Sequence, residues 1–199
     1  MWVVCADFEG VFVPEIWINV AKHTGIEKLK LTTRDIKDYE ALMKYRLQIL
    51  DENNLKLQDI QRIIALMKPL DGALDFIRWL RQVTRFIIVS DTFIEFAQPL
   101  LDKLENPLLL CHSLETDETG RITNYLLRQP DAKRMTVEAF RSLNYQTIAF
   151  GDSYNDIAML KAADKGILFC PPDNVVVDYP EFRVTRSIPE LQLALKQFI

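Results

Sequence analysis

The chain has 199 residues, of which 49% are hydrophobic and 26% charged, with a formal net charge of -4 and a pI near 5.3. This composition is typical of a globular protein that can bury a core without disulfides or metals. The acidic balance and the lack of a long Lys/Arg cluster argue against binding to nucleic acid or anionic lipid. No apolar run reaches the roughly 18 residues that span a bilayer. We therefore expect a small-molecule partner, and the sequence gives no indication of the oligomeric state.

The cysteines, histidines and glycines exclude several chemistries. The three cysteines are widely spaced and odd in number, which favours reduced core thiols and a cytoplasmic location. The N-terminal segment has no basic start and Asp7 interrupts its apolar stretch, which argues against a signal peptide. The six glycines are too dispersed for a nucleotide-binding loop, and two histidines are too few for a zinc cluster. Any metal must therefore be bound by oxygen.

Short apolar segments alternate with helical patterns along most of the chain. We expect buried strands at residues 2–6, 86–89, 147–150 and 167–170, and helices at residues 74–80, 94–104, 132–140 and 157–163. Turn residues between 108–111 and 122–127 predict a β-hairpin. This alternation predicts an α/β fold with a doubly wound, mostly parallel, Rossmann-like sheet.

Residues 11–70 interrupt the alternation. Pro14 opens one predicted helix, and residues 38–52 and 57–67 form two more helical patterns. A connection of about 60 residues is too long for an ordinary loop between two strands. We therefore expect a core made of residues 1–12 and 71–199, with an inserted helical cap of residues 13–70.

Three of the predicted strands run directly into an aspartate, at Asp7, Asp91 and Asp152. The carboxyl ends of parallel strands share one edge of the sheet, where open α/β folds bind ligands. Each aspartate alone is better explained as a helix cap or turn residue than as a catalytic group. Together with Glu9 and Asp156, however, they place up to five carboxylates near one crevice. Like charges about 4 Å apart repel by about 4 kcal/mol at an effective dielectric of 20, so we expect a hard divalent cation, Mg²⁺, at this edge.

Four motifs carry a family resemblance. Residues 7–10 (DFEG), residues 90–92 (SDT), Lys133 and residues 151–156 (GDSYND) resemble, in order and spacing, the motifs of the haloacid dehalogenase-like phosphatases. More narrowly, the Asp-x-Glu first motif and residues 13–17 (VPEIW) resemble the phosphoserine phosphatase branch, in particular the bifunctional phosphoserine phosphatase/homoserine phosphotransferases. The resemblance implies Mg²⁺-dependent hydrolysis of O-phospho-L-serine through an aspartyl-phosphate, with transfer of the phosphoryl group to L-homoserine as a second reaction.

The resemblance also implies roles for the carboxylates. Asp7 would be the nucleophile and Glu9 the general acid and base, although Glu9 replaces the usual aspartate with a side chain one methylene longer. The metal would be held by Asp7, the main-chain carbonyl of Glu9 and Asp152. Asp156 would brace these ligands or their waters.

Polar residues of the second, third and fourth motifs are implied to bind substrate. Ser90, the backbone beginning at Asp91, and Lys133 would bind the phosphoryl oxygens. Asn155 would orient Asp7 or contact the substrate. Taken alone, Lys133 is also explained as a solvated cation in a polar segment.

Two charged residues of the predicted cap are candidates for substrate recognition. Arg46 falls on the apolar stripe of residues 38–52, where a guanidinium needs an anion such as a substrate carboxylate. Glu15 could bind an ammonium group, or favourably occupy the first turn of a helix. An ion pair between Glu15 and Arg46 would explain both residues without substrate. The family resemblance favours recognition of an α-amino acid head group, as in phosphoserine.

Two other functions remain open on the sequence alone. The first is a Mg²⁺-dependent phosphatase for another small phosphate ester, because the core motifs determine the reaction and the cap determines the substrate. The second is a phosphorylated receiver-type signalling module, which also combines a doubly wound sheet with clustered acids. A receiver needs neither the inserted segment nor the loop at residues 151–156, so we favour an enzyme.

Overall fold

The computed structural model describes residues 1–32, 35–36 and 38–199. Its elements are, in chain order, β1 (Trp2–Ala6), α1 (Ile16–Thr24), η1 (Glu27–Lys30), α2 (Tyr39–Glu52), α3 (Leu57–Leu66), α4 (Ala73–Val83), β2 (Arg85–Phe93), α5 (Ile94–Leu101), η2 (Asp102–Leu104), β3 (Leu109–Thr116), β4 (Ile122–Leu126), α6 (Ala132–Ser142), β5 (Gln146–Gly151), η3 (Tyr154–Asp156), α7 (Ile157–Ala162), β6 (Lys165–Phe169), α8 (Asp173–Asp178), β7 (Arg183–Thr185) and α9 (Ile188–Leu195). The elements written η are 3-10 helices.

The strands form one sheet of order β4-β3-β2-β1-β5-β6-β7. The neighbouring strands are parallel, apart from the antiparallel pair β3 and β4. This confirms the predicted α/β fold with a mostly parallel sheet, and the hairpin expected between residues 108 and 127 is the β3–β4 pair.

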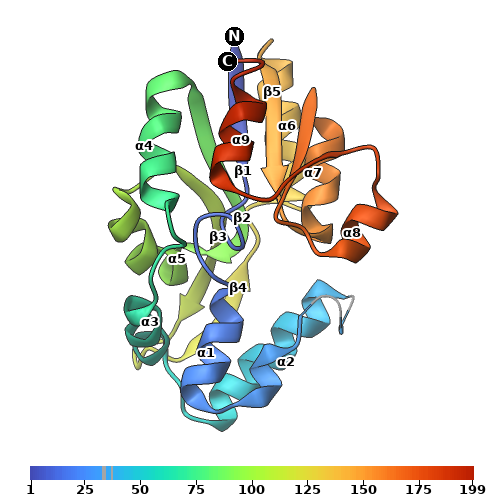
Figure 1. The fold of residues 1–199 in the computed structure, drawn as a ribbon. Coiled ribbons are helices and arrows are strands. Elements are labelled where there is room, and N and C mark those ends of the chain that lie inside the picture. Colours follow the sequence, from blue (N-terminus) through green and yellow to red (C-terminus); the bar gives the residue numbers. More distant parts are fainter. Residues whose placement is uncertain (33–34, 37) are drawn as a thin grey trace.

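Helices cover both faces of the sheet, because successive side chains of a buried strand point to opposite sides. Val4 and Ala6 of β1 pack in the larger apolar cluster, with residues of α4, α5 and α9. Cys5, between them, packs in the smaller cluster with residues of α6, α7 and α8. Figure 1 shows these helices as layers on either side of the sheet.

The helices of the inserted segment lie together at one end of the molecule. Figure 1 shows α1, α2 and α3 beyond the end of the sheet toward which the β5 arrow points. Apolar residues of these helices, such as Val20 and Met43, belong to the same buried cluster as Phe8, which follows β1. The apolar core is therefore continuous from the sheet into these helices, which places their inner faces opposite the carboxyl ends of the central strands.

Some details differ from the predictions. β2 continues through Phe93, so Ser90 and Asp91 lie within the strand rather than after it. The pairing of β2 with β3 shifts register between Val89 and Phe93. α1 begins at Ile16, two residues after Pro14. Cys5 is buried as expected, but Cys170 is exposed, so the prediction of a core thiol is wrong there. All three cysteines are free.

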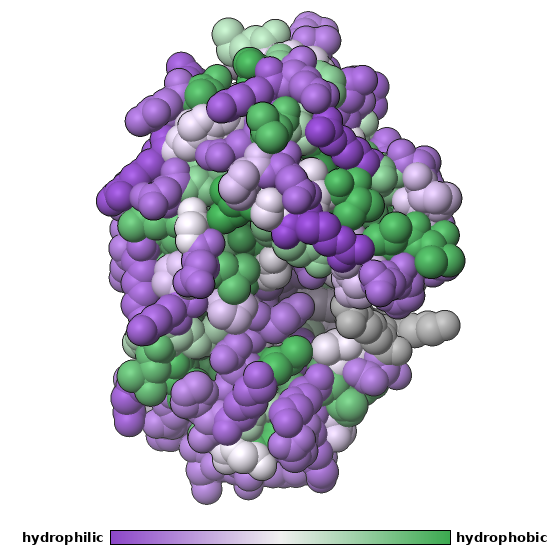
Figure 2. Space-filling model, in the orientation of Figure 1, coloured by the Kyte–Doolittle hydropathy of each residue, from purple (hydrophilic) through white to green (hydrophobic). Residues whose placement is uncertain are grey.

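The surface of the molecule is largely hydrophilic on the face shown in Figure 2, where apolar side chains occur in small groups. In the described part of the chain, no helix combines the length and apolarity that crossing a bilayer requires.

Candidate active site

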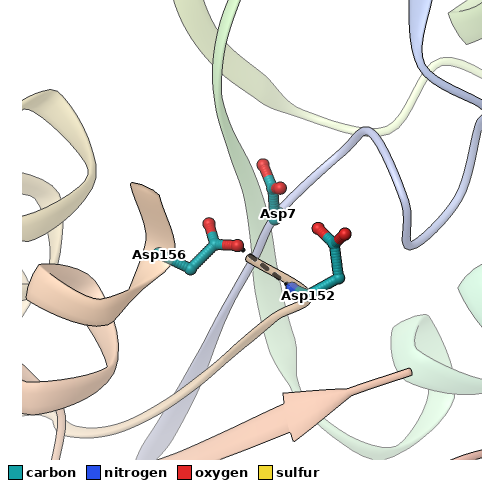
Figure 3. A group of neighbouring side chains, drawn as sticks. All are labelled: Asp7, Asp152 and Asp156. Carbon is teal, nitrogen blue, oxygen red and sulfur yellow. Dashed lines mark hydrogen bonds between the residues drawn. The ribbon is translucent and has the colours of Figure 1, made fainter. Parts of the chain in front are cut away.

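Three carboxylates meet at the carboxyl edge of the sheet. Asp7 directly follows β1, Asp152 directly follows β5, and Asp156 ends the short helix η3. One oxygen of each lies within 4.8 Å of one oxygen of the others. Figure 3 shows the three side chains gathered where these strands end. The sequence prediction that these acids converge is confirmed for this trio.

Lys133 supplies the positive charge at the centre of this cluster. The residue lies in the first turn of α6, and its Nζ donates to Asp7 Oδ1 and to Asp156 Oδ1, both at 2.7 Å. Only 3% of Lys133 is exposed, so the alternative of a solvated cation is wrong. An ammonium group has three N–H donors, and the two carboxylates accept from two of them. Asp91 Oδ2 lies 3.8 Å from Lys133 Nζ.

The loop after β5 holds Asp156 by its backbone. The amides of Asp152 and Ser153 donate to Asp156 Oδ2 at 3.0 and 3.1 Å, and the first of these bonds is the dashed line in Figure 3. Gly10 approaches the cluster from the other side. It has a φ of +75°, and a Cβ there would lie 2.5 Å from the carboxylate carbon of Asp152. Only glycine therefore fits this turn without displacing Asp152.

Burial, and then the crowding of negative charge, raise the pKa values of the acids. Burial, and then the charge of Asp156, raise the pKa of Asp7 well above its ordinary range. The same two causes raise the pKa of Asp152 to about 7. Burial lowers the pKa of Lys133, but the charges of Asp156 and Asp7 outweigh it and raise that pKa well above 10.5. The single ammonium of Lys133 therefore does not neutralise all the carboxylates of the cluster.

Glu9 lies in the same pocket and is held by the inserted segment. Its Oε2 accepts a hydrogen bond of 2.7 Å from the amide of Ile16, the first residue of α1. Burial, and then the charge of Glu15, raise the pKa of Glu9 to about 8. A pKa raised in this direction favours the protonated form of Glu9 at neutral pH, which is the form that a general acid needs.

The second motif forms one wall of the pocket. Ser90 is buried, and its Oγ accepts a hydrogen bond from the amide of Thr92 at 3.2 Å. The carboxylate of Asp91 accepts from Asn155 Nδ2, also at 3.2 Å. Asn155 therefore contacts Asp91, and no hydrogen bond among the described residues supports its predicted role in orienting Asp7.

Arg46 enters the pocket from α2 and has unused donors. It is 7% exposed, its Nη2 donates to the carbonyl of Leu31 at 2.8 Å, and its guanidinium lies 4.5 Å from the centre of the Trp17 ring. Among the described residues, its Nη1 contacts the sulfur of Met43 at 3.9 Å, and its buried Nε has no hydrogen-bond partner. Such an orphaned buried donor is costly unless a ligand satisfies it.

Glu15 lies at the mouth of the same pocket. It is exposed and precedes α1, but its side chain makes no capping hydrogen bond. Among the described residues no ion pair joins Glu15 to Arg46, so the interpretation that these two residues satisfy each other directly is not supported. Glu15 and Arg46 both line the cavity, and no hydrogen bond among the described residues occupies the Glu15 carboxylate or the Nε of Arg46.

These residues enclose one cavity of about 190 Å³ between the sheet and the inserted helices. Every predicted site residue except the buried Asp156 lines it. The lining also contains residues that the sequence analysis did not single out as site residues: Trp17, Ile18, Thr32, Tyr39, Leu42, Thr92, Ser153 and Tyr154. A signal for two of them was present, because Tyr39 and Leu42 share the helical stripe of Arg46.

The carboxylate cluster fits a hard divalent cation. Asp7, Asp152 and Asp156 offer only oxygen donors, within the spacing that one ion can bridge. After burial, the charge of Asp156 is the next cause of the raised pKa values of both Asp7 and Asp152. A bound divalent cation would offset this repulsion.

A family model describes most of this chain. Residues 4–164 match the haloacid dehalogenase-like hydrolase model, and this range contains each of the four motifs and the inserted segment. The chain therefore belongs to the haloacid dehalogenase-like hydrolase family.

Two relatives match nearly the whole chain. A phosphoserine phosphatase of Pseudomonas syringae pv. tomato is 56% identical over 197 residues, which are 99% of this chain and 82% of the relative. The phosphoserine phosphatase ThrH of Pseudomonas aeruginosa is 55% identical over 192 residues, which are 96% of this chain and 94% of the relative.

Solved structures share the fold. The crystal structure of a phosphoserine phosphatase in its apo form superposes with a TM-score of 0.77 at 21% identity, covering 99% of this chain and 98% of the other. A phospho-aspartyl intermediate analogue of phosphoserine phosphatase gives 0.75 at 20% identity, with the same coverage. The arrangement of the sheet and the inserted helices is therefore common to both.

Proposed function

We propose that this chain is a Mg²⁺-dependent phosphoserine phosphatase that forms an aspartyl-phosphate on Asp7 and can pass the phosphoryl group to water or to L-homoserine. The observation that carries the proposal is that one cavity is lined both by acidic residues with Lys133 and by Arg46 of the inserted helices. Acids and Lys133 line the cavity from the core, and Arg46, whose Nε has no hydrogen-bond partner among the described residues, lines it from the inserted helices. The relatives at 55% and 56% identity are both named phosphoserine phosphatases.

The cavity also supports the division of the chain. Residues 1–12 and 71–199 supply the reacting groups, and residues 13–70 supply Arg46 and Glu15. We infer that residues 13–70 act as a cap that reads the substrate, while the core carries the reaction. This division explains why one fold can serve many phosphate esters.

The phosphoryl group is transferred in two displacements. A carboxylate oxygen of Asp7 attacks phosphorus, the bond from phosphorus to the serine oxygen breaks, and Glu9 gives its proton to the leaving oxygen. Glu9, now ionised, then takes a proton from the attacking water or alcohol as the bond from phosphorus to Asp7 breaks. Lys133 already donates to Asp7, so its charge lies where charge develops on the phosphoryl oxygens.

The other polar groups hold the phosphoryl group and the metal. Ser90 and Asp91 line the cavity, and the Ser90 hydroxyl and the amides that begin at Asp91 would bind the phosphoryl oxygens. Mg²⁺ would be held by Asp7, Asp152 and the main-chain carbonyl of Glu9, with Asp156 bracing them through the loop amides, and it would neutralise phosphoryl charge. Asn155 fixes the side chain of Asp91.

The amino acid end of the substrate fits the cap. A carboxylate would satisfy the buried Nε of Arg46, and an ammonium would pair with Glu15. Homoserine carries the same head group with one more methylene, a difference worth only about 1 to 3 kcal/mol in a pocket. One site can therefore accept phosphoserine as donor and homoserine as acceptor.

The experiment that tests this function is ³¹P NMR of the protein with Mg²⁺ and O-phospho-L-serine, with and without L-homoserine. We expect inorganic phosphate in both cases and a phosphohomoserine signal when homoserine is present. Asp7→Asn should be inert. If the wild-type protein cleaves an aryl phosphate but not phosphoserine, the core reaction stands and the amino acid assignment is wrong.

A further inference from the structure

Tyr39 connects the inserted helices to the core at the wall of the cavity. It is the first residue of α2, and its hydroxyl donates to the main-chain carbonyl of Asp91 at 3.2 Å. Its ring packs edge-on against Tyr125 of β4, with centroids 6.0 Å apart. Among the described residues, this is the one hydrogen bond that joins α2 to a core residue lining the cavity. Loss of the hydroxyl would therefore loosen α2 specifically at the site.

The acceptor is available because β2 is irregular at this point. The pairing of β2 with β3 shifts register between Val89 and Phe93, so Asp91 has no Cα partner in β3. The same irregular segment carries Ser90 and the amides that we assign to the phosphoryl group. Burial, and then the charge of Asp91, raise the pKa of Tyr39 above its ordinary value, so its hydroxyl remains protonated and remains a donor. The bond therefore attaches α2 to the phosphoryl-binding segment itself.

Tyr39 also shares a face of α2 with the substrate-reading residue. Tyr39, Leu42 and Arg46 are separated by three and four residues, which places them along one face of the helix, and all three line the cavity. A helix is rigid over this distance, so the position of Tyr39 determines where Arg46 lies relative to the phosphoryl end. The hydrogen bond to Asp91 therefore attaches to the core the same helical face that carries Arg46.

We propose that Tyr39 is a positioning residue whose hydrogen bond to Asp91 favours transfer of the phosphoryl group to homoserine over its loss to water. This inference rests on the proposed function. With α2 held against the core, Arg46 is in place to bind the carboxylate of the acceptor, and the cavity admits less water. When the bond is absent, water still enters, because it needs neither Arg46 nor Glu15.

The two outcomes differ only in the attacking oxygen. In hydrolysis a water oxygen bonds to phosphorus, the bond to Asp7 breaks, and Glu9 takes a proton from the water. In transfer the hydroxyl oxygen of homoserine bonds to phosphorus, the same bond breaks, and Glu9 takes the hydroxyl proton. Both products come from one intermediate, so their ratio does not depend on how fast that intermediate forms or on how much protein is folded.

The test compares Tyr39→Phe with the wild-type protein. Phosphohomoserine and inorganic phosphate are measured by ³¹P NMR at a series of homoserine concentrations. We expect the ratio of phosphohomoserine to phosphate to fall about two- to tenfold in Tyr39→Phe, the range that loss of one net hydrogen bond gives. The homoserine concentration for half-maximal transfer should rise. Tyr45→Phe removes a hydroxyl from the same helix outside the cavity lining and should leave the ratio unchanged.

The outcomes separate this inference from the function on which it rests. A ratio that is unchanged or increased in Tyr39→Phe, while the wild-type protein makes phosphohomoserine, overturns the role of Tyr39 and leaves the proposed function standing. An equal fall of the product ratio in Tyr45→Phe also overturns the role of Tyr39, because the hydrogen bond to Asp91 would then not be the cause of the change. Absence of phosphohomoserine from the wild-type reaction overturns the transfer reaction and this inference together.

Discussion

Lys133 and Asp7 are 126 residues apart in the chain, and their side chains meet at 2.7 Å. The fold brings them together because β1 ends beside β5 in the sheet, and α6 begins at the same edge. The ammonium also binds Asp156, so one buried cation links the proposed nucleophile to the loop that follows β5. The contacts of Lys133 and of the residues across the cavity allow us to predict how substitutions at the site change activity and stability.

Removal of the Arg46 guanidinium should weaken the reaction of phosphoserine and spare that of a simple phosphate ester. In Arg46→Met the stem still packs on Trp17, but the carboxylate loses a charged hydrogen-bond partner. We expect kcat/KM for phosphoserine to fall about 10- to 150-fold, the range for such bonds, in a phosphate-release assay. For an aryl phosphate without an amino acid group, kcat/KM should stay near the wild-type value.

A matched control for this variant is Arg62→Met, which removes an exposed guanidinium from α3. Its activity on both substrates should equal that of the wild-type protein. Equal losses on phosphoserine and aryl phosphate in Arg46→Met would show that Arg46 does not read the amino acid group.

Glu9→Gln should separate the two displacements. An aryl alcohol leaves without help from an acid, so the variant should release one equivalent of it rapidly and then turn over slowly, because no base activates water. With phosphoserine the first displacement should slow as well, by about 10²- to 10⁴-fold. Stopped-flow detection of the aryl alcohol measures the burst. Steady turnover of the aryl phosphate at the wild-type rate would contradict the role of Glu9.

Magnesium should stabilise the protein through the carboxylate cluster. At an ion concentration about 100 times Kd, the linkage relation gives about 2.7 kcal/mol, which for a chain of this size raises Tm by about 5 to 10 °C. Without metal, and above the pKa of about 7 for Asp152, Asp152→Asn should melt higher than the wild-type protein, because one repelling charge is removed. With Mg²⁺ the order should reverse.

Thermal melts with and without Mg²⁺ at about pH 8 measure both effects, since Asp152 is ionised there. Asp173→Asn, an exposed acid of α8, is the matched control and should behave as the wild-type protein does. An equal rise of Tm with Mg²⁺ in Asp152→Asn would place the ion elsewhere.

Protonation of His112 should contribute to loss of stability in acid. Its Nδ1 accepts a hydrogen bond from the amide of Arg128 at 3.1 Å, so a second ring proton would remove that bond. Burial lowers its pKa below 6.5, and the unfolded chain therefore binds the proton more tightly than the folded one. Linkage then makes the free energy of unfolding fall as the pH drops through about 6.5.

His112→Asn keeps an acceptor near the position of Nδ1 and removes the titration. Between about pH 7.5 and pH 5.5, its unfolding free energy in urea should fall less than that of the wild-type protein. His23→Asn, at an exposed position of α1, should show the wild-type fall. An identical fall in all three proteins would exclude His112 as a contributor.

The sheet was predictable because its central strands are short apolar runs between helical patterns. Residues 2–6 were predicted without error, and the helices expected at 74–80 and 132–140 are α4 and α6. β7 was missed because its three residues, Arg183–Thr185, lie at an edge of the sheet and form no apolar run. The sequence also could not show that β2 continues through Asp91, because that depends on its pairing with β3.

The reacting groups were predictable, but their contacts were not. Acids that follow parallel strands share one edge of the sheet, so the positions of Asp7 and Asp152 after two apolar runs are enough to predict that they lie close together. The hydrogen bond from the amide of Ile16 to Glu9 depends on how the inserted helices pack against the core, which no local sequence pattern predicts. The same holds for Arg46, which stacks on Trp17 and leaves Nε unsatisfied rather than pairing with Glu15.

The most direct test of the proposed mechanism is to detect the phosphoryl group on Asp7. The protein is mixed with Mg²⁺ and O-phospho-L-serine, quenched in acid within the first turnover, digested and analysed by mass spectrometry. We predict that the peptide containing Asp7 gains the mass of one HPO₃, with fragment ions that place it on Asp7, and that Asp7→Asn shows neither the adduct nor phosphate release. Phosphate release by Asp7→Asn at the wild-type rate, or an adduct on another residue, would contradict the mechanism.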